Sequence, residues 1–225
     1  MRYFFLSIIF ILFYSCKKEN DKIINLNSCS NSSFIDGSGN SYSTVTIGNK
    51  CWFSTNLKTK KFNNGDSIMY VVSGTQWQNS SVGSFCFYNN DSALGSVYGF
   101  LYNFATITDP RAICPIGSHV ANDSDWIDLN SVINSNGGVL KEIGTTNWAS
   151  PNIAASDLYN FSALGSGFRT YTGVFANLSL QGRWWCSDDS TFNTAFNYYI
   201  KNNDSLLIKD YDLKTSGFSI RCVAD

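Results

Sequence analysis

Short runs of alternating apolar and polar residues dominate this chain and are separated by turn residues. The run 42–47 ends at Gly48-Asn49 and is followed by Cys51-Trp52-Phe53, which predicts a hairpin with a two-residue turn. Further runs of this kind lie at 85–88, 100–104, 168–171, 184–186, 195–200, 206–208 and 218–223. Because a period of two is typical of strands with one buried face, the pattern predicts a β-rich domain.

One segment follows a helical period instead. Residues 122–125 offer an Asn N-cap with an acidic side chain three residues later, and Gly137-Gly138 stops the segment. Between these limits, apolar residues recur at helical spacing: Trp126, Leu129 and Ile133. We therefore expect a helix over 123–134 whose apolar face packs on a sheet. Long structured loops are expected over 134–156, where neither period is visible.

The N-terminus has the pattern of a secretory signal. Arg2 precedes an apolar run over 4–13, which is too short for a bilayer, where about 20 apolar residues are needed. Leu12-Phe13-Tyr14-Ser15-Cys16 resembles a bacterial lipobox, in which cleavage leaves a cysteine that carries lipid. The residue Phe13 stands where Leu is usual.

The lipobox resemblance implies a signal peptide over 1–15, lipidation at Cys16 and a polar tether over 16–28. A single domain over 29–225 would follow, and we expect the mature chain not to span the membrane. The alternative is an ordinary secretory cleavage near Ser15 that leaves Cys16 unmodified.

The charge of the chain is nearly balanced, with 16 Lys and Arg against 17 Asp and Glu and a formal net charge of −1. Because there is no basic excess to attract a phosphate backbone, we expect no nucleic-acid partner. Charged residues make up only 15% of the chain, while aromatic residues reach 16%. That balance is typical of an extracellular β-rich domain rather than of a disordered chain.

Seven cysteines are spread along the chain: Cys16, Cys29, Cys51, Cys86, Cys114, Cys186 and Cys222. If Cys16 carries lipid, an even number remains in a compartment that permits disulfides. A metal site is disfavoured because no Cys-x-x-Cys pair occurs and His119 is the only histidine. The remaining cysteines allow about 15 connectivities, and their spacing alone does not choose among them.

Few residues have the arrangement that catalysis requires. We interpret His119 as a partly buried, hydrogen-bonded residue at the entry to the helix, because Cys114, its nearest cysteine, is expected to be bridged. Asp188 and Asp189 form the most suggestive acidic pair for glycoside hydrolysis, but adjacent strand residues point to opposite faces. A solvated turn is the preferred interpretation of this pair, and a Ca²⁺ ion bound through its carboxylates is the alternative.

Exposed tryptophan rings stack on sugars and are favoured at protein interfaces. Trp126 belongs to the apolar helix face and is expected in the core. In Trp184-Trp185, alternation sends one ring inward and the other outward, which leaves Trp185 as a candidate. Trp77 and Trp148 lie in loop-like surroundings and are expected to be exposed. The candidate ligand-binding residues are therefore Trp77, Trp148, Trp185, Asp188 and Asp189.

Ordered motifs cover roughly residues 40–225. In the first half they lie at 42–52, 56–57, 64–66, 88–91 and 99–104. In the second half they lie at 109–111, 114–115, 119–120, 125–126, 138–141, 147–148, 151–152, 161–164, 182–185 and 217–223. In this order they resemble the Fibrobacter succinogenes major paralogous domain.

That family is similar to C-type-lectin-like and formylglycine-generating-enzyme-like domains. The resemblance implies an α+β fold with small antiparallel sheets, one or two helices, long disulfide-stapled loops, and chain ends that pair near one another. The Ca²⁺-dependent sugar-binding motifs of true C-type lectins do not occur in the sequence, and Cys186 stands where the family commonly has Ser. Because fold does not carry function with it, the resemblance indicates a fold more readily than an activity.

The resemblance also implies a disulfide between Cys114, just before the helix, and Cys222 in the final strand. Cys29 and Cys51 flank the first hairpin and are the nearest plausible pair. Cys86 and Cys186 remain, and we expect them to form a bridge between two loops.

The sequence thus predicts a non-catalytic, surface-displayed binding module that recognises a glycan or a partner protein. We expect it to be anchored by lipid in the outer membrane, because Lys17-Lys18-Glu19 differs from an Asp-type inner-membrane retention signal. One alternative is a hydrolase acting on an extracellular polymer, with Asp188, Asp189 or His119 in its site. A structural component of a surface assembly is the other.

Overall fold

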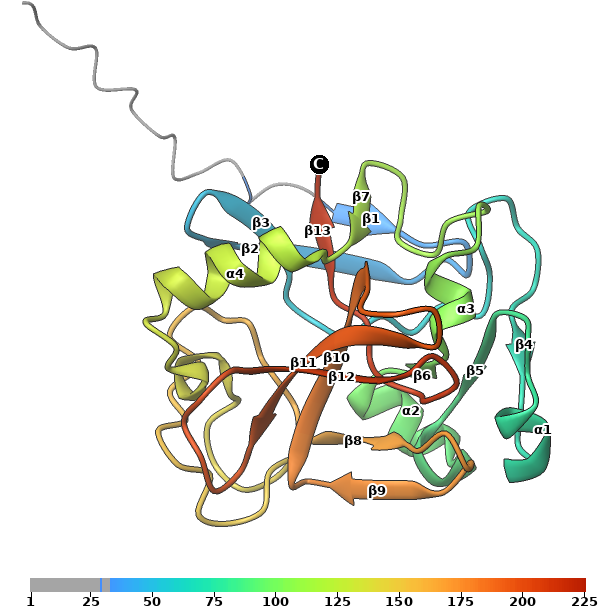
Figure 1. Ribbon diagram of the computed structural model, residues 1–225. Coiled ribbons are helices and arrows are strands. Elements are labelled where there is room, and N and C mark those ends of the chain that lie inside the picture. The colour runs from blue at the N-terminus through green and yellow to red at the C-terminus, as the bar shows by residue number, and fades with distance from the viewer. Residues whose placement is uncertain (1–28, 30–32) are drawn as a thin grey trace, which may run out of the picture.

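A computed structural model of the protein describes residues 29 and 33–225 (Figure 1). The predicted signal peptide, Cys16 and the whole tether over 16–28 lie outside the described residues. Within them the chain forms three small, mostly antiparallel sheets and a few helices, which is the α+β architecture in its coarse form. None of the helices in this part of the chain is long and apolar enough to cross a membrane.

The first sheet joins the two ends of the described chain in the order β1-β2-β3-β13-β7. Its strands are β1 (Ser33–Ile35), β2 (Ser41–Ile47), β3 (Lys50–Phe53), β7 (Ser118–Val120) and β13 (Cys222–Ala224). The predicted hairpin is β2 and β3, and Gly48 supplies the positive φ of 64° that its turn requires. Because β13 lies between β3 and β7, the first and last strands share one sheet, as expected.

The second sheet has the order β12-β11-β10-β8-β9, and the third has the order β4-β5-β6. The strands of the second are β8 (Ser166–Arg169), β9 (Phe175–Leu178), β10 (Gln181–Asp189), β11 (Thr194–Lys201) and β12 (Ile208–Leu213). Those of the third are β4 (Met69–Tyr70), β5 (Ser84–Cys86) and β6 (Leu101–Tyr102). Two pairings depart from the expected antiparallel arrangement, since β4 runs parallel to β5 and β8 runs parallel to β10.

Among the helices, α4 (Asp123–Val132) is the one that the sequence predicted. Asn122 and Asp125 form a reciprocal capping box, and the buried Trp126 packs on Trp52 of β3 and on Trp184 of β10. The remaining helices of the described chain are too short to show a period: α1 (Gly74–Gln78), α2 (Ser92–Tyr98), α3 (Phe104–Ile107), and the 3₁₀ turns η1 (Tyr88–Asn90) and η2 (Gly137–Leu140). The expected one or two helices therefore become four α-helices in this part of the chain.

Both faces of β10 are covered, and this overturns the expectation that Trp185 is exposed. Trp184 lies in the main core with Trp126, while Trp185 packs on Phe104 and Phe218 in a second cluster on the other face. Alternation does send the two rings to opposite faces. Neither face is solvent, because α3 and the segment before β13 cover the second one.

Two of the three predicted disulfides are present and the third is wrong. Cys29 is bonded to Cys51, and Cys114 is bonded to Cys222 across 108 positions of sequence. Cys86 and Cys186 are reduced and buried. They belong to different hydrophobic clusters, because β5 and β10 bury these side chains in separate places, and burial raises the pKa of each thiol to about 12.

The predicted loops after α4 are ordered, and we call residues 134–165, which connect α4 to β8, the long-loop region (Figure 1). Its carbonyls have few strand partners, and buried side chains donate to several of them. Trp148 Nε1 donates to the Ala163 carbonyl over 2.8 Å, and Asn152 Nδ2 donates to the carbonyls of Glu142 and Gly144. Buried donors therefore fix the shape of this region where a sheet ladder is missing.

Candidate functional site

The aromatic residues expected to bind a ligand are buried. Trp77, Trp148 and Trp185 are each at most 1% exposed. Their indole nitrogens donate to backbone carbonyls, and Trp77 Nε1, for instance, lies 2.7 Å from the Thr215 oxygen. The expectation of exposed rings is wrong because the loops around them fold over the rings and use their N–H groups.

Asp188 and Asp189 are exposed but already have partners. Asp188 Oδ2 accepts a hydrogen bond from the Asp123 backbone nitrogen at 2.6 Å, at the start of α4, and Asp189 pairs with Lys214 at 2.8 Å. Nowhere among residues 29 and 33–225 do three or more His, Cys, Asp or Glu side chains gather to hold a metal ion. These two carboxylates therefore connect the end of β10 to the start of α4 and to Lys214.

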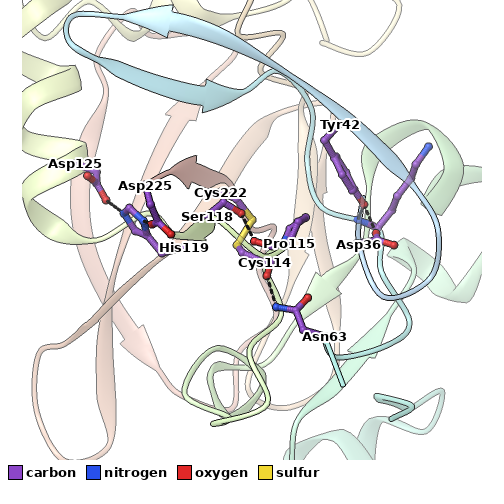
Figure 2. Close-up of a disulfide and its surroundings, with 11 residues drawn as sticks. Asp36, Tyr42, Asn63, Cys114, Pro115, Ser118, His119, Asp125, Cys222 and Asp225 are labelled. Atoms are coloured by element: carbon purple, nitrogen blue, oxygen red, sulfur yellow. Dashed lines mark hydrogen bonds and ion pairs between the residues drawn. A yellow bond between two sulfur atoms is a disulfide. The ribbon is translucent and has the colours of Figure 1, made fainter. Parts of the chain in front are cut away.

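His119 lies in a polar cluster next to the Cys114–Cys222 disulfide (Figure 2). Its Nε2 is 3.0 Å from Asp125 Oδ2 and its Nδ1 is 2.6 Å from Asp225 Oδ1. Hydrogen bonding to Asp125, and then to Asp225, raises the pKa of His119. Both ring nitrogens therefore face carboxylate oxygens, and this arrangement holds β7, α4 and Asp225 together.

Asp125 connects this cluster to the first hairpin. Lys50 Nζ lies 2.6 Å from Asp125 Oδ1 and 3.0 Å from Asp128. Burial alone would raise the pKa of Asp125, but the hydrogen bonds from His119 and Lys50 outweigh it and hold that pKa at about 2. The cluster borders a hollow of about 590 Å³, yet its charged side chains already bind one another.

Polar side chains gather instead in a groove on another face. One hollow of about 310 Å³ is lined by Ser38, Asn40, Lys58, Lys60, Ser96 and Phe100. A second hollow of about 310 Å³ shares Lys58 and Ser96 with the first and extends to Asn56, Glu142 and Ser162. Because the two hollows share residues, we treat them as one continuous feature and call it the Lys58 groove.

Arg221 fixes the two walls of the Lys58 groove to each other. Its guanidinium is fully buried and donates to Asn56 Oδ1 and to the Phe53 carbonyl on one wall. On the other wall, in the long-loop region, it donates to the carbonyls of Phe161 and Ser162 over 2.7 and 3.1 Å. With no carboxylate bonded to it, burial lowers the pKa of Arg221 to about 9.

The turn at Asp36 carries Ser38 and Asn40, which line the groove. The Asp36 carboxylate is 4% exposed and accepts hydrogen bonds from the backbone of Ser38 and Asn40, from Asn40 Nδ2, and from the Tyr42 hydroxyl at 2.6 Å. Burial and this carboxylate raise the pKa of Tyr42, so its hydroxyl stays protonated and donates. Figure 2 shows the Asp36–Tyr42 pair on the far side of the disulfide from His119.

The same turn holds the backbone of the two groove lysines. Asn40 Nδ2 donates to the Lys58 carbonyl, the Lys58 nitrogen donates to the Tyr42 hydroxyl at 3.0 Å, and the Lys60 nitrogen donates to Ser38 Oγ at 2.8 Å. Between the lysines, Thr59 is fully buried and its carbonyl accepts from Tyr102. The segment is thus rigid before any ligand arrives.

Comparison with protein families decides what kind of chain this is. The model of the Fibrobacter succinogenes major domain matches residues 45–224. The chain belongs to that family. No curated protein and no solved structure matches this member of the Fibrobacter succinogenes major domain family.

In this family member, sequence reasoning missed the residues that make the groove. A signal for Lys58 and Lys60 was present, since two lysines at alternate positions are conspicuous in a chain with only 15% charged residues. The signal for Ser38, Asn40 and Ser96 was absent, because such residues are common in turns throughout this chain.

Proposed function

We propose that this protein is a lipid-anchored binding module of the outer membrane, displayed on the cell surface, and that the Lys58 groove recognises a glycan. We further propose that its fold is a C-type-lectin-like variant with residues 134–165 as its long loops. Support for the fold comes from the shared sheet of the first and last strands and from the Cys114–Cys222 disulfide. Support for export comes from the two disulfides, which persist in oxidising compartments.

The observation that carries the glycan proposal is the composition of a preformed groove. The hydroxyl of Ser96 and the ammonium group of Lys58 lie beside the half-exposed side chain of Val97. Sugars present hydroxyls at their edges and C–H groups on their faces, so a groove that offers both kinds of contact suits them. Hydrogen bonds from Arg221 and the Asp36 turn hold the walls in place, which lowers the entropic cost of binding.

A glycan and protein array probed with the purified protein tests this proposal. Ser96 is exposed on α2 and lines both hollows, so Ser96→Trp fills the groove and is expected to abolish binding. Ala93→Trp places the same ring on an exposed position of the same helix that lines neither hollow, and it should bind like wild type. Equal binding by both variants, or binding to proteins alone, would overturn the glycan site.

The lipid anchor has its own test. Mass spectrometry of the membrane-extracted protein should show a chain that begins at Cys16 with acyl groups attached. Cys16→Ser should release the protein from the membrane fraction. Recovery of wild-type protein with an unmodified N-terminus would contradict the anchor.

A further inference from the structure

Within the Lys58 groove, Lys58 and Lys60 form a cationic end. Both side chains line the same hollow, while Thr59 between them is fully buried. The ten ion pairs found within residues 29 and 33–225 use Lys50, Lys209 and Lys214 but neither Lys58 nor Lys60. The groove therefore has two ammonium groups without a protein carboxylate bound to them.

The acidic groups near these lysines are engaged elsewhere. Asp36 is buried, and each of its carboxylate oxygens accepts two hydrogen bonds from the turn. Glu142 lines only the hollow that lacks Lys60, where its Oε2 accepts a hydrogen bond from Asn147 at 2.8 Å. The groove thus has Lys60 in one hollow and Glu142 in the other, with Lys58 lining both.

Groups that bind sugar hydroxyls and an apolar surface surround the cationic end. Ser38, Asn40 and Ser96 line the same hollow as the two lysines, and Phe100 forms part of its wall. A cation pair alone would bind any small anion. Ser38 and Asn40 bond within the turn, so beside the lysines the exposed Ser96 hydroxyl and the exposed Val97 side chain remain to contact a sugar, and this combination favours an anion carried on a sugar ring.

We propose that the Lys58 groove binds acidic glycans, with the carboxylate or sulfate of one sugar between Lys58 and Lys60 and the adjoining sugar directed toward Glu142. This inference rests on the proposed glycan-binding function and specifies its ligand class. The net charge of −1 means that the preference comes from this groove and not from an overall basic surface.

An array that pairs each acidic oligosaccharide with its own neutral form tests the proposal on the purified protein. Methyl-esterified uronic acids and desulfated sugars serve as the neutral forms. We expect the acidic member of a pair to bind about tenfold more tightly, and its affinity to fall as salt rises through the screening range. Acidic members that bind no better than neutral ones overturn the acidic preference while leaving glycan binding intact. If no oligosaccharide binds, both proposals fail.

Two matched variants locate the effect. Lys58→Gln and Lys60→Gln should each weaken binding of the acidic member about five- to tenfold and leave the neutral member unchanged. Lys61→Gln removes the same charge from the next residue, which is exposed and lines neither hollow, and should bind like wild type. If Lys61→Gln reduces affinity as much as Lys60→Gln does, the effect is one of general charge and the site is wrong.

Discussion

In the sheet β1-β2-β3-β13-β7, backbone groups pair strand to strand and two disulfides join the strands to neighbouring segments, whereas the long-loop region is held by buried side chains. Lys141 of that region and Arg221, which precedes β13 and bonds to that region, are both fully buried and donate to backbone carbonyls. Lys141 also lies over the Trp148 ring and Arg221 over the Phe161 ring. The Lys58 groove forms where the two regions meet.

The comparison of the sheet with the long-loop region indicates where a loop-rich fold can use a buried cation. A buried cation is costly, and burial lowers the pKa of Lys141 to about 8. Irregular loops expose carbonyls that no strand can satisfy, so one buried cation can serve several of them. In a sheet, hydrogen bonds between strands leave few carbonyls free to accept from a buried cation. The first sheet is constrained by its two disulfides instead. The following predictions are ordered by the size of the expected effect.

Removal of the long disulfide should have the largest effect on the sheet region. In the chain-entropy model, the bond between Cys114 and Cys222 contributes about 4.7 kcal/mol for a loop near 100 residues. The Cys29–Cys51 bond closes a much shorter loop and is worth about 3.4 kcal/mol in that model. Denaturant unfolding of the two Cys→Ser double variants measures both losses. A greater loss from the shorter loop would refute the assigned roles.

The equivalent change at the contact with the long-loop region is Arg221→Met. It leaves the carbonyls of Phe53, Phe161 and Ser162 without this donor, and we expect a loss of about 3–5 kcal/mol. Arg111→Met is the matched control, because Arg111 forms ion pairs with Asp66 and Asp109 at the surface, where water and salt screen them. Similar losses in the two variants would show that the buried cation has no special role.

Lys141→Met should cost about 2–3 kcal/mol, since it removes the bonds from Nζ to the carbonyls of Lys201 and Asp204. The pKa of Lys141 is lower in the folded protein than in the unfolded chain, so its unfolded form binds more protons between pH 8 and pH 10. Wild-type stability should therefore rise relative to the variant over that range. Thermal unfolding at several pH values checks this, with the exposed Lys61→Met as control. If the difference in stability between wild type and Lys141→Met stays constant from pH 8 to pH 10, the burial of the Lys141 amine is contradicted.

The smallest effect is expected at His119, whose pKa is raised by Asp125 and Asp225. The stabilisation is complete below the unfolded pKa of about 6.5 and is lost as the pH rises through the higher folded value. For partly exposed pairs worth about 0.5–1 kcal/mol, the melting temperature of wild type relative to His119→Gln should fall by about 1–4 °C between pH 6 and pH 9, a difference in which the opposite effect of Lys141 cancels. His119→Gln should remove this part of the pH dependence. An unchanged profile in that variant would place the titrating group elsewhere.

Local patterns predicted those parts of the fold that local physics determines. The capping box of α4 and the turn of the β2–β3 hairpin each depend on a few consecutive residues, and both are confirmed. The burial of Trp77 and Trp148 was not predictable in this way, because it depends on loops that fold over these rings. Likewise, an isolated lysine such as Lys141 is normally solvated, and only the tertiary structure shows which carbonyls surround it.

The candidate site depended even more on tertiary structure. Lys58 and Lys60 are visible as a pair in the sequence, but the absence of a bound carboxylate is a property of the folded surface in the described part of the chain. The same holds for Arg221, which belongs to the motif at 217–223 yet bonds to residues 53–56 and 161–162. The sequence predicted the scaffold well and the binding surface poorly.

The central claim is that the groove between the two regions is the binding site, and hydrogen exchange tests it most directly. Mass spectrometry should compare the protein with and without the acidic oligosaccharide that binds best on the array. We predict slower exchange in 38–41, 55–60 and 96–100 on one wall and in 161–164 on the other, with the His119 cluster unchanged. Protection confined to residues 73–82 or to the surroundings of His119 would contradict the account.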